Sequence, residues 1–372
     1  MHLYVHVPFC ARRCSYCDFA IAVRRVVPSE RFVAAVLREW DAYGQHPMWA
    51  AGRAVETLYF GGGTPSRLDP SGVARILDAI GRDRRIEPGA EITLEANPDD
   101  VTRASAGRWR DAGVTRVSLG VQSFDAGVLA WMHRTHTPEQ SVEAVAVLRD
   151  AGIGEVSLDL IFGLPAALGR CFDRDLARAL ALRPEHVSLY GLTVEPGTPL
   201  GRWAARGEAV SADEDRYAAE YLAAHAALVA AGYEHYEVSN AGLPGRRARH
   251  NSAYWRRAPY LGLGPSAHSA VGAERWWNLR DWAAYVAASD RGESVVAGRE
   301  ALTPEADSLE EVYLGLRTSE GVPADRIGAG AAAAWTAAGW AERHAGRIRL
   351  TPEGWLRLDA LAAATPLSGG SA

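Results

Sequence analysis

The side chains with the clearest chemical potential are three cysteines near the N-terminus, in the stretch Cys10-Ala-Arg-Arg-Cys14-Ser-Tyr-Cys17. Their C-x₃-C-x₂-C spacing directly follows an apolar run, and a loop of this length can turn three thiolates toward one point. Cysteine thiolates are the usual ligands of iron–sulfur clusters, and three of them on a four-iron cube leave one iron free for a substrate or cofactor. A zinc site and a disulfide are the alternatives, although zinc usually takes four ligands and a disulfide needs only two cysteines.

Composition sets the class of protein that must position these cysteines. The chain has 372 residues, of which 48% are hydrophobic and 23% charged, as in a globular protein with one large and one small domain. A net charge of −5 gives no reason to expect nucleic acid as a partner. Four cysteines, three of them in one motif, argue against a disulfide framework and favour a reducing compartment. With neither a signal-peptide pattern nor a long apolar run, we expect a cytoplasmic protein.

A strand–helix rhythm fills the first two-thirds of the chain. Short apolar runs predict strands at residues 3–8, 57–60, 91–96, 116–120, 155–161 and 186–190. Start and stop signals predict helices at about 28–43, 69–82, 102–113 and 137–152. Strands that alternate with helices form parallel sheets through right-handed crossovers, so we expect an α/β fold with an open, partial (β/α)₆ barrel related to the eight-unit barrel.

The chain divides into four expected segments. Residues 1–210 form the barrel, 211–300 a segment that closes it, 301–365 a small C-terminal domain, and 366–372 a disordered tail. The closing segment contains a predicted helix at 212–231 and a strand at 233–238. Short helices, a hairpin at 340–350 and a last helix opened by Thr351 give the C-terminal domain an α+β, winged-helix-like pattern. Its acidity argues against DNA binding.

Polar or glycine residues follow the predicted strands, where a barrel would gather them at one mouth. Gly61, Gly62, Gly63 and Thr64 end the second strand and leave backbone groups open to a ligand, although such a run is often only a tight turn. Glu95, Gln122 and Asp159 lie in or just after the next three strands. Since a buried unpaired carboxylate is costly, these side chains need either internal partners, such as Arg116 or Arg134, or a ligand.

These motifs together resemble a known family. The cysteine spacing is typical of the radical S-adenosylmethionine (SAM) superfamily. The stretches Tyr4-Val-His6-Val-Pro8-Phe9-Cys10, Leu94-Glu95-Ala-Asn-Pro98, Gly120-Val-Gln122-Ser, His133-Arg134 and Asp159-Leu-Ile-Phe-Gly-Leu-Pro165 resemble those of oxygen-independent coproporphyrinogen III oxidase and its relatives. The resemblance implies a [4Fe-4S] cluster on Cys10, Cys14 and Cys17. It implies SAM contacts from Tyr4, Tyr16, Gly62, Gly63, Thr64, Glu95, Gln122, Arg134 and Asp159.

Two departures point to a heme-chaperone branch of this family. The oxidase has a fourth cysteine two residues after the third, where this chain has Asp18-Phe19, and it has an N-terminal extension, whereas Met1 stands three residues before Tyr4 here. The stretch His250-Asn-Ser-Ala-Tyr254-Trp is an HNxxYW motif, which the resemblance associates with heme, and His250 could ligate the iron. The alternative is a surface loop whose aromatic rings pack on the barrel.

The sequence therefore predicts a protein that binds heme and transfers it to an acceptor, with a cluster and exchangeable SAM as cofactors. The alternatives are a coproporphyrinogen III oxidase-like enzyme, whose activity we do not expect, and a radical SAM enzyme for an unrelated substrate. Whether SAM is cleaved is open. The acceptor is not identified; a membrane-associated respiratory protein and a homodimer are both compatible with the resemblance.

Three further residues have open roles. His268 and Asn278 either face the active site or fix the glycine-rich loop that begins at Tyr260. Cys171, at an expected helix start, could ligate heme but is better interpreted as a small buried core thiol.

Overall fold

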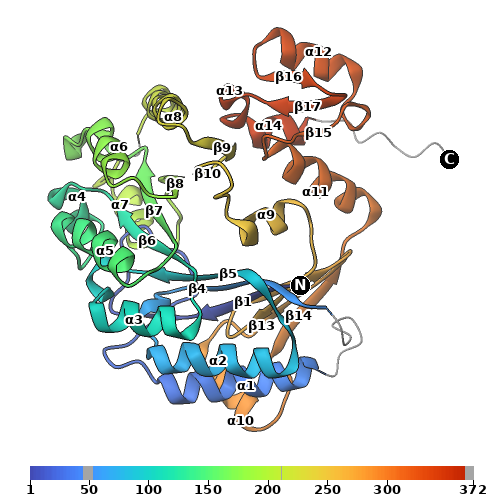
Figure 1. Ribbon diagram of the computed structural model, residues 1–372. Helices are drawn as coiled ribbons and strands as arrows, with labels where there is room; N and C mark the ends of the chain where they lie inside the picture. Colours follow the sequence, from blue (N-terminus) through green and yellow to red (C-terminus); the bar gives the residue numbers. More distant parts are fainter. Residues whose placement is uncertain (45–52, 211, 365–372) are drawn as a thin grey trace.

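The computed structural model describes residues 1–44, 53–210 and 212–364, and its centre is a twelve-stranded sheet (Figure 1). The six predicted strands are present, adjacent in chain order and parallel. They are β1 His2–Val7, β4 Val55–Gly62, β5 Ile86–Ala96, β6 Arg116–Gln122, β7 Glu155–Phe162 and β8 His186–Gly191. The expected α/β architecture is confirmed, and the carboxyl ends of these strands meet at one edge.

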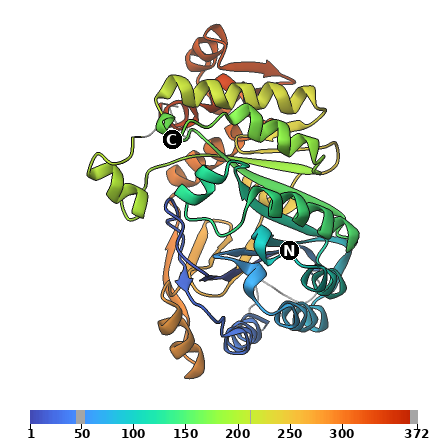
Figure 2. The same cartoon turned by 90° about the vertical axis from the view of Figure 1, so that its left-hand side faces the viewer.

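Helices connect these strands and cover the outer face of the sheet (Figures 1 and 2). They are α1 Ser29–Gly44, α2 Pro70–Asp83, α3 Arg103–Ala112, α4 Ala126–Trp131, α5 Pro138–Asp150 and α6 Phe172–Ala181, with 3₁₀ turns at η2 Pro65–Arg67, η3 Pro98–Asp100 and η4 Ala166–Leu168. The predicted starts are confirmed, because the side chains of Asp69, Thr102 and Thr137 accept hydrogen bonds from the first turns of α2, α3 and α5.

The segment after residue 211 extends the same sheet at both edges. On the β1 side, β11 Tyr260–Leu263 pairs in parallel with β1, and antiparallel strands follow at β12 His268–Val271, β13 Glu274–Asn278 and β14 Val296–Ala301. On the β8 side lie β10 Asn240–Gly242 and β9 Glu234–Glu237. Of these strands the sequence predicted only β9, because the others are short and lack an alternating apolar pattern.

Helix α7 Pro199–Ala205 precedes this segment, and the helices within it are α8 Glu214–Ala230, α9 Arg249–Trp255 and α10 Trp282–Asp290. In Figure 1, α9 lies between the sheet and the C-terminal residues. A short parallel pair, β2 Phe9–Cys10 and β3 Ala22–Val23, flanks the cysteine loop.

The C-terminal residues form a separate three-stranded sheet in the order β15-β17-β16. Its elements are α11 Pro304–Leu316, β15 Val322–Pro323, η5 Ala324–Arg326, α12 Ala329–Ala337, β16 Ala341–His344, β17 Arg347–Leu350, α13 Pro352–Trp355 and α14 Leu358–Ala363. The predicted hairpin is β16–β17, while the predicted last helix is divided in two. The winged-helix likeness stays an interpretation, and the expected tail lies outside the described residues.

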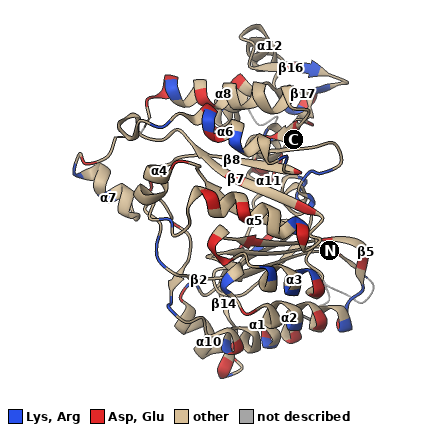
Figure 3. Ribbon diagram, turned by 60° about the vertical axis from the view of Figure 1, so that its left-hand side comes forward, with Lys and Arg blue, Asp and Glu red and all other residues tan. Residues whose placement is uncertain are grey.

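Apolar side chains from the sheet and its covering helices form one continuous core, which includes Leu3, Leu58, Leu94 and Leu158. Charged residues of both signs alternate on the outer helices, whereas β7 and β8 carry few (Figure 3). Within the described residues, no helix combines the length and the apolar character needed to cross a membrane.

Candidate cluster and ligand site

The three cysteines of the N-terminal motif line one cavity of about 410 Å³ at the carboxyl end of the parallel strands. Cys10 ends β2, Cys14 and Cys17 follow in the loop, and all three are free, half-buried thiols. The Thr64 hydroxyl donates to Cys10 Sγ at 3.4 Å, and Arg134 Nη1 donates to Cys14 Sγ at 3.6 Å. The loop therefore presents its sulfur atoms to one space, with donors already directed at two of them.

The donor set fits a four-iron cluster. Among the residues that the structure describes, no three His, Cys, Asp or Glu side chains converge on a single metal ion. In a cube each thiolate binds a different iron, so its sulfur atoms need not share one centre. Burial raises the pKa of the Cys10 thiol, against the Thr64 hydrogen bond, and raises that of Cys17 to about 11, so cluster assembly would release protons from these thiols.

The glycine run at the end of β4 forms one wall of this cavity. Gly62 has φ +114°, in the left-handed region that favours glycine. A Cβ on Gly63 would lie 2.6 Å from the carbonyl oxygen of Pro8, so only glycine lets β4 end directly against the start of the cysteine loop. The run is therefore both a tight turn and a ligand-accessible wall.

Two half-buried carboxylates face the same cavity without an ion-pair partner among the described residues. Glu95 accepts hydrogen bonds from Tyr59 Oη at 2.8 Å and Gly62 N at 3.0 Å, and Asp159 accepts one from Ser118 Oγ at 3.0 Å. Burial raises the pKa of Glu95 to about 7 and that of Asp159 to about 6. A cationic ligand would stabilise both charged forms.

The internal pairing considered for these carboxylates does not occur, because both arginines have other partners. Arg116 pairs with Glu155 at 2.9 Å. Arg134 Nη2 donates to Asn97 Oδ1 at 2.6 Å and to the Gly120 carbonyl at 2.8 Å, while its buried Nε has no partner in the described chain. An unpartnered donor beside two unpaired carboxylates suits a zwitterionic ligand.

The structure brings together all but one of the residues predicted to contact SAM. The cavity is lined by Tyr16, Gly62, Gly63, Thr64, Glu95, Gln122, Arg134 and Asp159. Tyr4 does not line it and instead borders another cavity, described below. Sequence reasoning missed Asn97, Ser118 and Tyr190, which also line the cavity. Asn97 follows β5 and Tyr190 lies one residue before the end of β8, whereas Ser118 lies inside β6.

His250 lies apart from the cluster cavity, on α9, and is only 1% exposed. Its Nδ1 is 2.7 Å from Thr57 Oγ1, and its Nε2 is 2.7 Å from Tyr254 Oη. Burial lowers its pKa to about 3, so the imidazole is neutral. Since both ring nitrogens are hydrogen-bonded, ligation of iron by His250 requires one of these two bonds to break.

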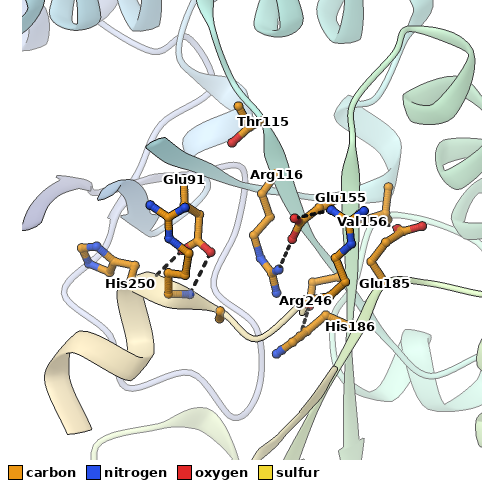
Figure 4. A network of polar contacts seen from close by, with 12 residues as sticks. Glu91, Thr115, Arg116, Glu155, Val156, Glu185, His186, Arg246 and His250 are labelled. Carbon is orange, nitrogen blue, oxygen red and sulfur yellow. Dashed lines mark hydrogen bonds and ion pairs between the residues drawn. The ribbon is translucent and has the colours of Figure 1, made fainter. Parts of the chain in front are cut away.

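A polar network holds α9 in this position (Figure 4). Glu91 of β5 accepts from the backbone N–H groups of Arg249 and His250, both at 2.8 Å, where a carboxylate stabilises a helix N-terminus. Beside it, Glu155 pairs with Arg116 and, at 2.8 Å, with Arg246 just before the helix. The HNxxYW motif is therefore fixed to the sheet rather than forming a loose surface loop.

Comparisons with known proteins agree with this geometry. A family model described as the Radical SAM superfamily matches residues 4–173. A protein from Mycobacterium tuberculosis named heme chaperone HemW is 38% identical over 369 residues, which cover 96% of this chain and 93% of that protein. This chain belongs to the HemW family. The Escherichia coli HemW is 37% identical over 277 residues, covering 73% of this chain and 70% of the relative.

A solved structure supports the fold of this HemW-family chain. Coproporphyrinogen III oxidase (HemN) from Escherichia coli superimposes with a TM-score of 0.80 and 22% sequence identity, covering 97% of this chain and 88% of that one. Membership in the radical SAM superfamily implies a [4Fe-4S] cluster and SAM, and the cysteine loop, glycine wall and buried carboxylates are the features that would hold them.

The HNxxYW region of this HemW-family chain borders a second cavity, of about 450 Å³, which shares no lining residue with the cluster cavity. We call it the second cavity; its lining includes Tyr4, His6, Tyr254, Tyr260, His268 and Arg275. Of the two residues with open roles, His268 thus faces this space. Asn278 is buried and fixes the loop, because it donates to the Gly264 carbonyl at 2.8 Å and to Glu39 at 2.6 Å.

The interpretation of Cys171 as a buried core thiol is wrong. Cys171 does precede α6, at the predicted helix start, but it is exposed. The apolar side chain that enters the core at this point is the next residue, Phe172, which is 3% exposed.

Proposed function

We propose that this chain is a heme chaperone, which binds heme and transfers it to an acceptor protein. The observation that carries the proposal is 38% identity over nearly the whole length of a relative named heme chaperone HemW. The second cavity supports it, since its volume lies in the range of small-molecule sites and its lining includes the aromatic side chains Tyr4, Tyr254, Trp255 and Tyr260.

In this proposal Cys10, Cys14 and Cys17 hold a [4Fe-4S] cluster, whose open iron supplies a binding point and an electron source for SAM. The chain's own groups orient that ligand. Glu95 and Asp159 would face its positive charges, and Gly62, Gly63 and Thr64 would offer backbone and hydroxyl groups. Arg134 would face its carboxylate, and Tyr16 and Gln122 would complete the wall. Tyr4 belongs to the second cavity instead.

Coproporphyrinogen oxidase activity is not expected of this chain. Asp18 and Phe19, which stand where the oxidase has its fourth cysteine, line the cluster cavity, and the Phe19 residue is 60% exposed. Neither the Asp18 nor the Phe19 side chain can replace the thiol that the oxidase has at this point. SAM cleavage itself stays open, because the residues that would bind SAM are the same in both functions.

The location and partners follow from the same reasoning. A cytoplasmic location suits a cluster that depends on reduced thiols, because reducing compartments keep cysteines free. The acceptor would be another protein, with a membrane-associated respiratory protein as one candidate. A homodimer is also compatible with the proposal.

An anaerobic titration of cluster-loaded protein with heme, followed by absorbance, tests the proposed function. We expect a saturable Soret band at about one heme per chain. His250→Ala would weaken it if His250 is the ligand, and Tyr254→Phe separates ligation from positioning because it removes only the hydroxyl partner of Nε2. Absence of saturable binding by the unaltered protein would overturn the proposal.

A further inference from the structure

Two histidines line the second cavity, and only one of them is free to bind a metal. His6 is 7% exposed and uses both nitrogens, with Nδ1 3.1 Å from Tyr4 Oη and Nε2 2.9 Å from the Ala20 carbonyl. His268, on β12, is exposed, and its ring nitrogens have no hydrogen-bond partner within the described residues. It is therefore an accessible imidazole directed into a cavity.

The His268 ring is held in place without using its nitrogens. It stacks on Trp277 of the neighbouring strand β13, with ring centroids 5.9 Å apart and planes 26° apart. Trp277 in turn lies across Gly298 of β14, where a Cβ would be 2.4 Å from the indole. Partial burial lowers the His268 pKa, which favours the neutral imidazole that binds metals.

The walls of the second cavity suit a flat aromatic ligand. Tyr254 and Tyr260 meet edge to face with centroids 4.5 Å apart, and Tyr4 and Trp255 also line the space. Aromatic side chains pack well against extended π-systems.

Positive charge lies directly beside this space. A neighbouring cavity of about 400 Å³ shares Trp255 and Arg257 with the second cavity and is also lined by Arg249, Arg256 and Arg347. Those last three arginines form no ion pair with a carboxylate within the described residues, although Arg249 and Arg347 donate to backbone carbonyls. Glu311 and Glu320 also line this cavity. Guanidinium groups bind carboxylates well, so this rim could hold the two propionates of a porphyrin.

We propose that heme binds in the second cavity with His268 as an axial ligand of the iron and its propionates toward the arginine-lined rim. This assignment rests on the proposed heme-chaperone function. His250 then has a positioning role, because it holds Tyr254 in the wall of the cavity. The assignment places heme in a cavity that shares no lining residue with the cluster cavity.

The test is a heme titration of cluster-loaded protein carrying His268→Ala, with His344→Ala as the matched control. His344 is an exposed histidine on β16 that lines neither the second nor the arginine-lined cavity. We expect His268→Ala to weaken binding about tenfold or more and to shift the Soret band, whereas His344→Ala changes neither. Added imidazole should restore the original band in His268→Ala by occupying the vacated position.

The outcomes distinguish failure of the His268 ligand assignment from failure of the proposed chaperone function. Heme binding by His268→Ala that matches the unaltered protein in affinity and spectrum would overturn the ligand assignment and leave the chaperone proposal standing. No heme binding by the unaltered protein would overturn both. A shifted band that imidazole restores would establish His268 as the ligand.

Discussion

The cluster cavity and the second cavity share one sheet but differ in how their charges are balanced. In the cluster cavity Glu95 and Asp159 are half-buried and form no ion pair within the described residues, so a positively charged ligand would stabilise their charged forms. In the second cavity Arg275 donates to both oxygens of Glu310, at 3.1 and 2.8 Å, and Arg257 pairs with Asp307. The cluster cavity therefore favours a positively charged ligand. In the second cavity the charged side chains pair with each other, so the groups left to contact a ligand are His268 and the aromatic rings.

The cavities also differ in origin, which explains their chemistry. Cluster-cavity residues come from successive parallel strands, whose ends meet at one edge of the sheet. The second cavity combines β1, α9, β11, β12 and α11, which are distant in sequence. The first arrangement suits a cofactor site, and the second is where we propose that heme binds.

Removal of one cluster cysteine should give the largest difference between its effect on the cluster and its effect on heme binding. We expect Cys14→Ala to abolish iron and sulfide incorporation, because the cube loses a ligand. Heme affinity should stay within about twofold, since the two sites do not share residues. Iron and sulfide analysis alongside heme titration measures both effects. Cys171→Ala, at the exposed cysteine, is the control and should retain the cluster; loss of heme binding in Cys14→Ala would show that the cavities are coupled.

Removal of one buried charge should affect only the cluster cavity. Glu95→Gln keeps the shape but loses the carboxylate that would face SAM, so we expect SAM affinity to fall by about ten- to a hundredfold. Equilibrium binding of SAM to the reconstituted protein measures this. Glu139→Gln, on the exposed surface of α5, serves as the control. Unchanged SAM affinity in Glu95→Gln would place the ligand elsewhere.

The same variant should also change how stability depends on pH. The pKa of Glu95 is raised to about 7 in the folded chain, so the folded state holds a proton that the unfolded state releases near pH 4.5. The contribution of Glu95 to the free energy of unfolding therefore falls as pH rises from about 4.5 to 7. Buried histidines such as His6, whose pKa is lowered to about 4, make the free energy of unfolding rise with pH. Because both proteins contain these histidines, their contribution cancels when the variant is compared with the unaltered protein.

We therefore expect Glu95→Gln to gain stability relative to the unaltered protein as pH rises, by the order of 3 kcal/mol across that range. Denaturant unfolding of both proteins at several pH values, without SAM, measures the difference. A difference that does not vary with pH would contradict the buried, unpaired state of Glu95.

The smallest expected effect concerns the arginine-lined rim. Arg256→Gln and Arg347→Gln should weaken heme binding about two- to fivefold, because exposed charge interactions are modest. The Soret band should not move, since neither residue touches the iron. Arg343→Gln, an exposed arginine on β16, is the control. A shifted Soret band in either rim variant would place its side chain at the iron.

Sequence patterns were enough to predict the six parallel strands and the cluster cavity. Gly62, Glu95 and Gln122 lie at or near the ends of β4, β5 and β6, and Asp159 lies three residues before the end of β7, so neighbouring parallel strands bring them to one cavity. Tyr4 was expected there only from the family resemblance, and it does not line this cavity.

The second cavity could not be predicted in this way. The parallel pairing of β11 with β1 joins residues about 258 positions apart, as in His2 with Tyr260, and no local pattern encodes it. The burial of His250 depends on Glu91, which fixes α9 from a distant strand. Likewise the exposure of Cys171 depends on which neighbouring residue, here Phe172, enters the core.

The most direct test of the account compares two activities of one cluster- and SAM-loaded preparation under strict anaerobiosis. One sample receives heme and the other receives coproporphyrinogen III. We predict saturable heme uptake, transferable to an added apo-acceptor such as apomyoglobin, and no conversion of the porphyrinogen. Conversion of coproporphyrinogen III without heme uptake would contradict the chaperone function and identify the chain as an oxidase-like enzyme.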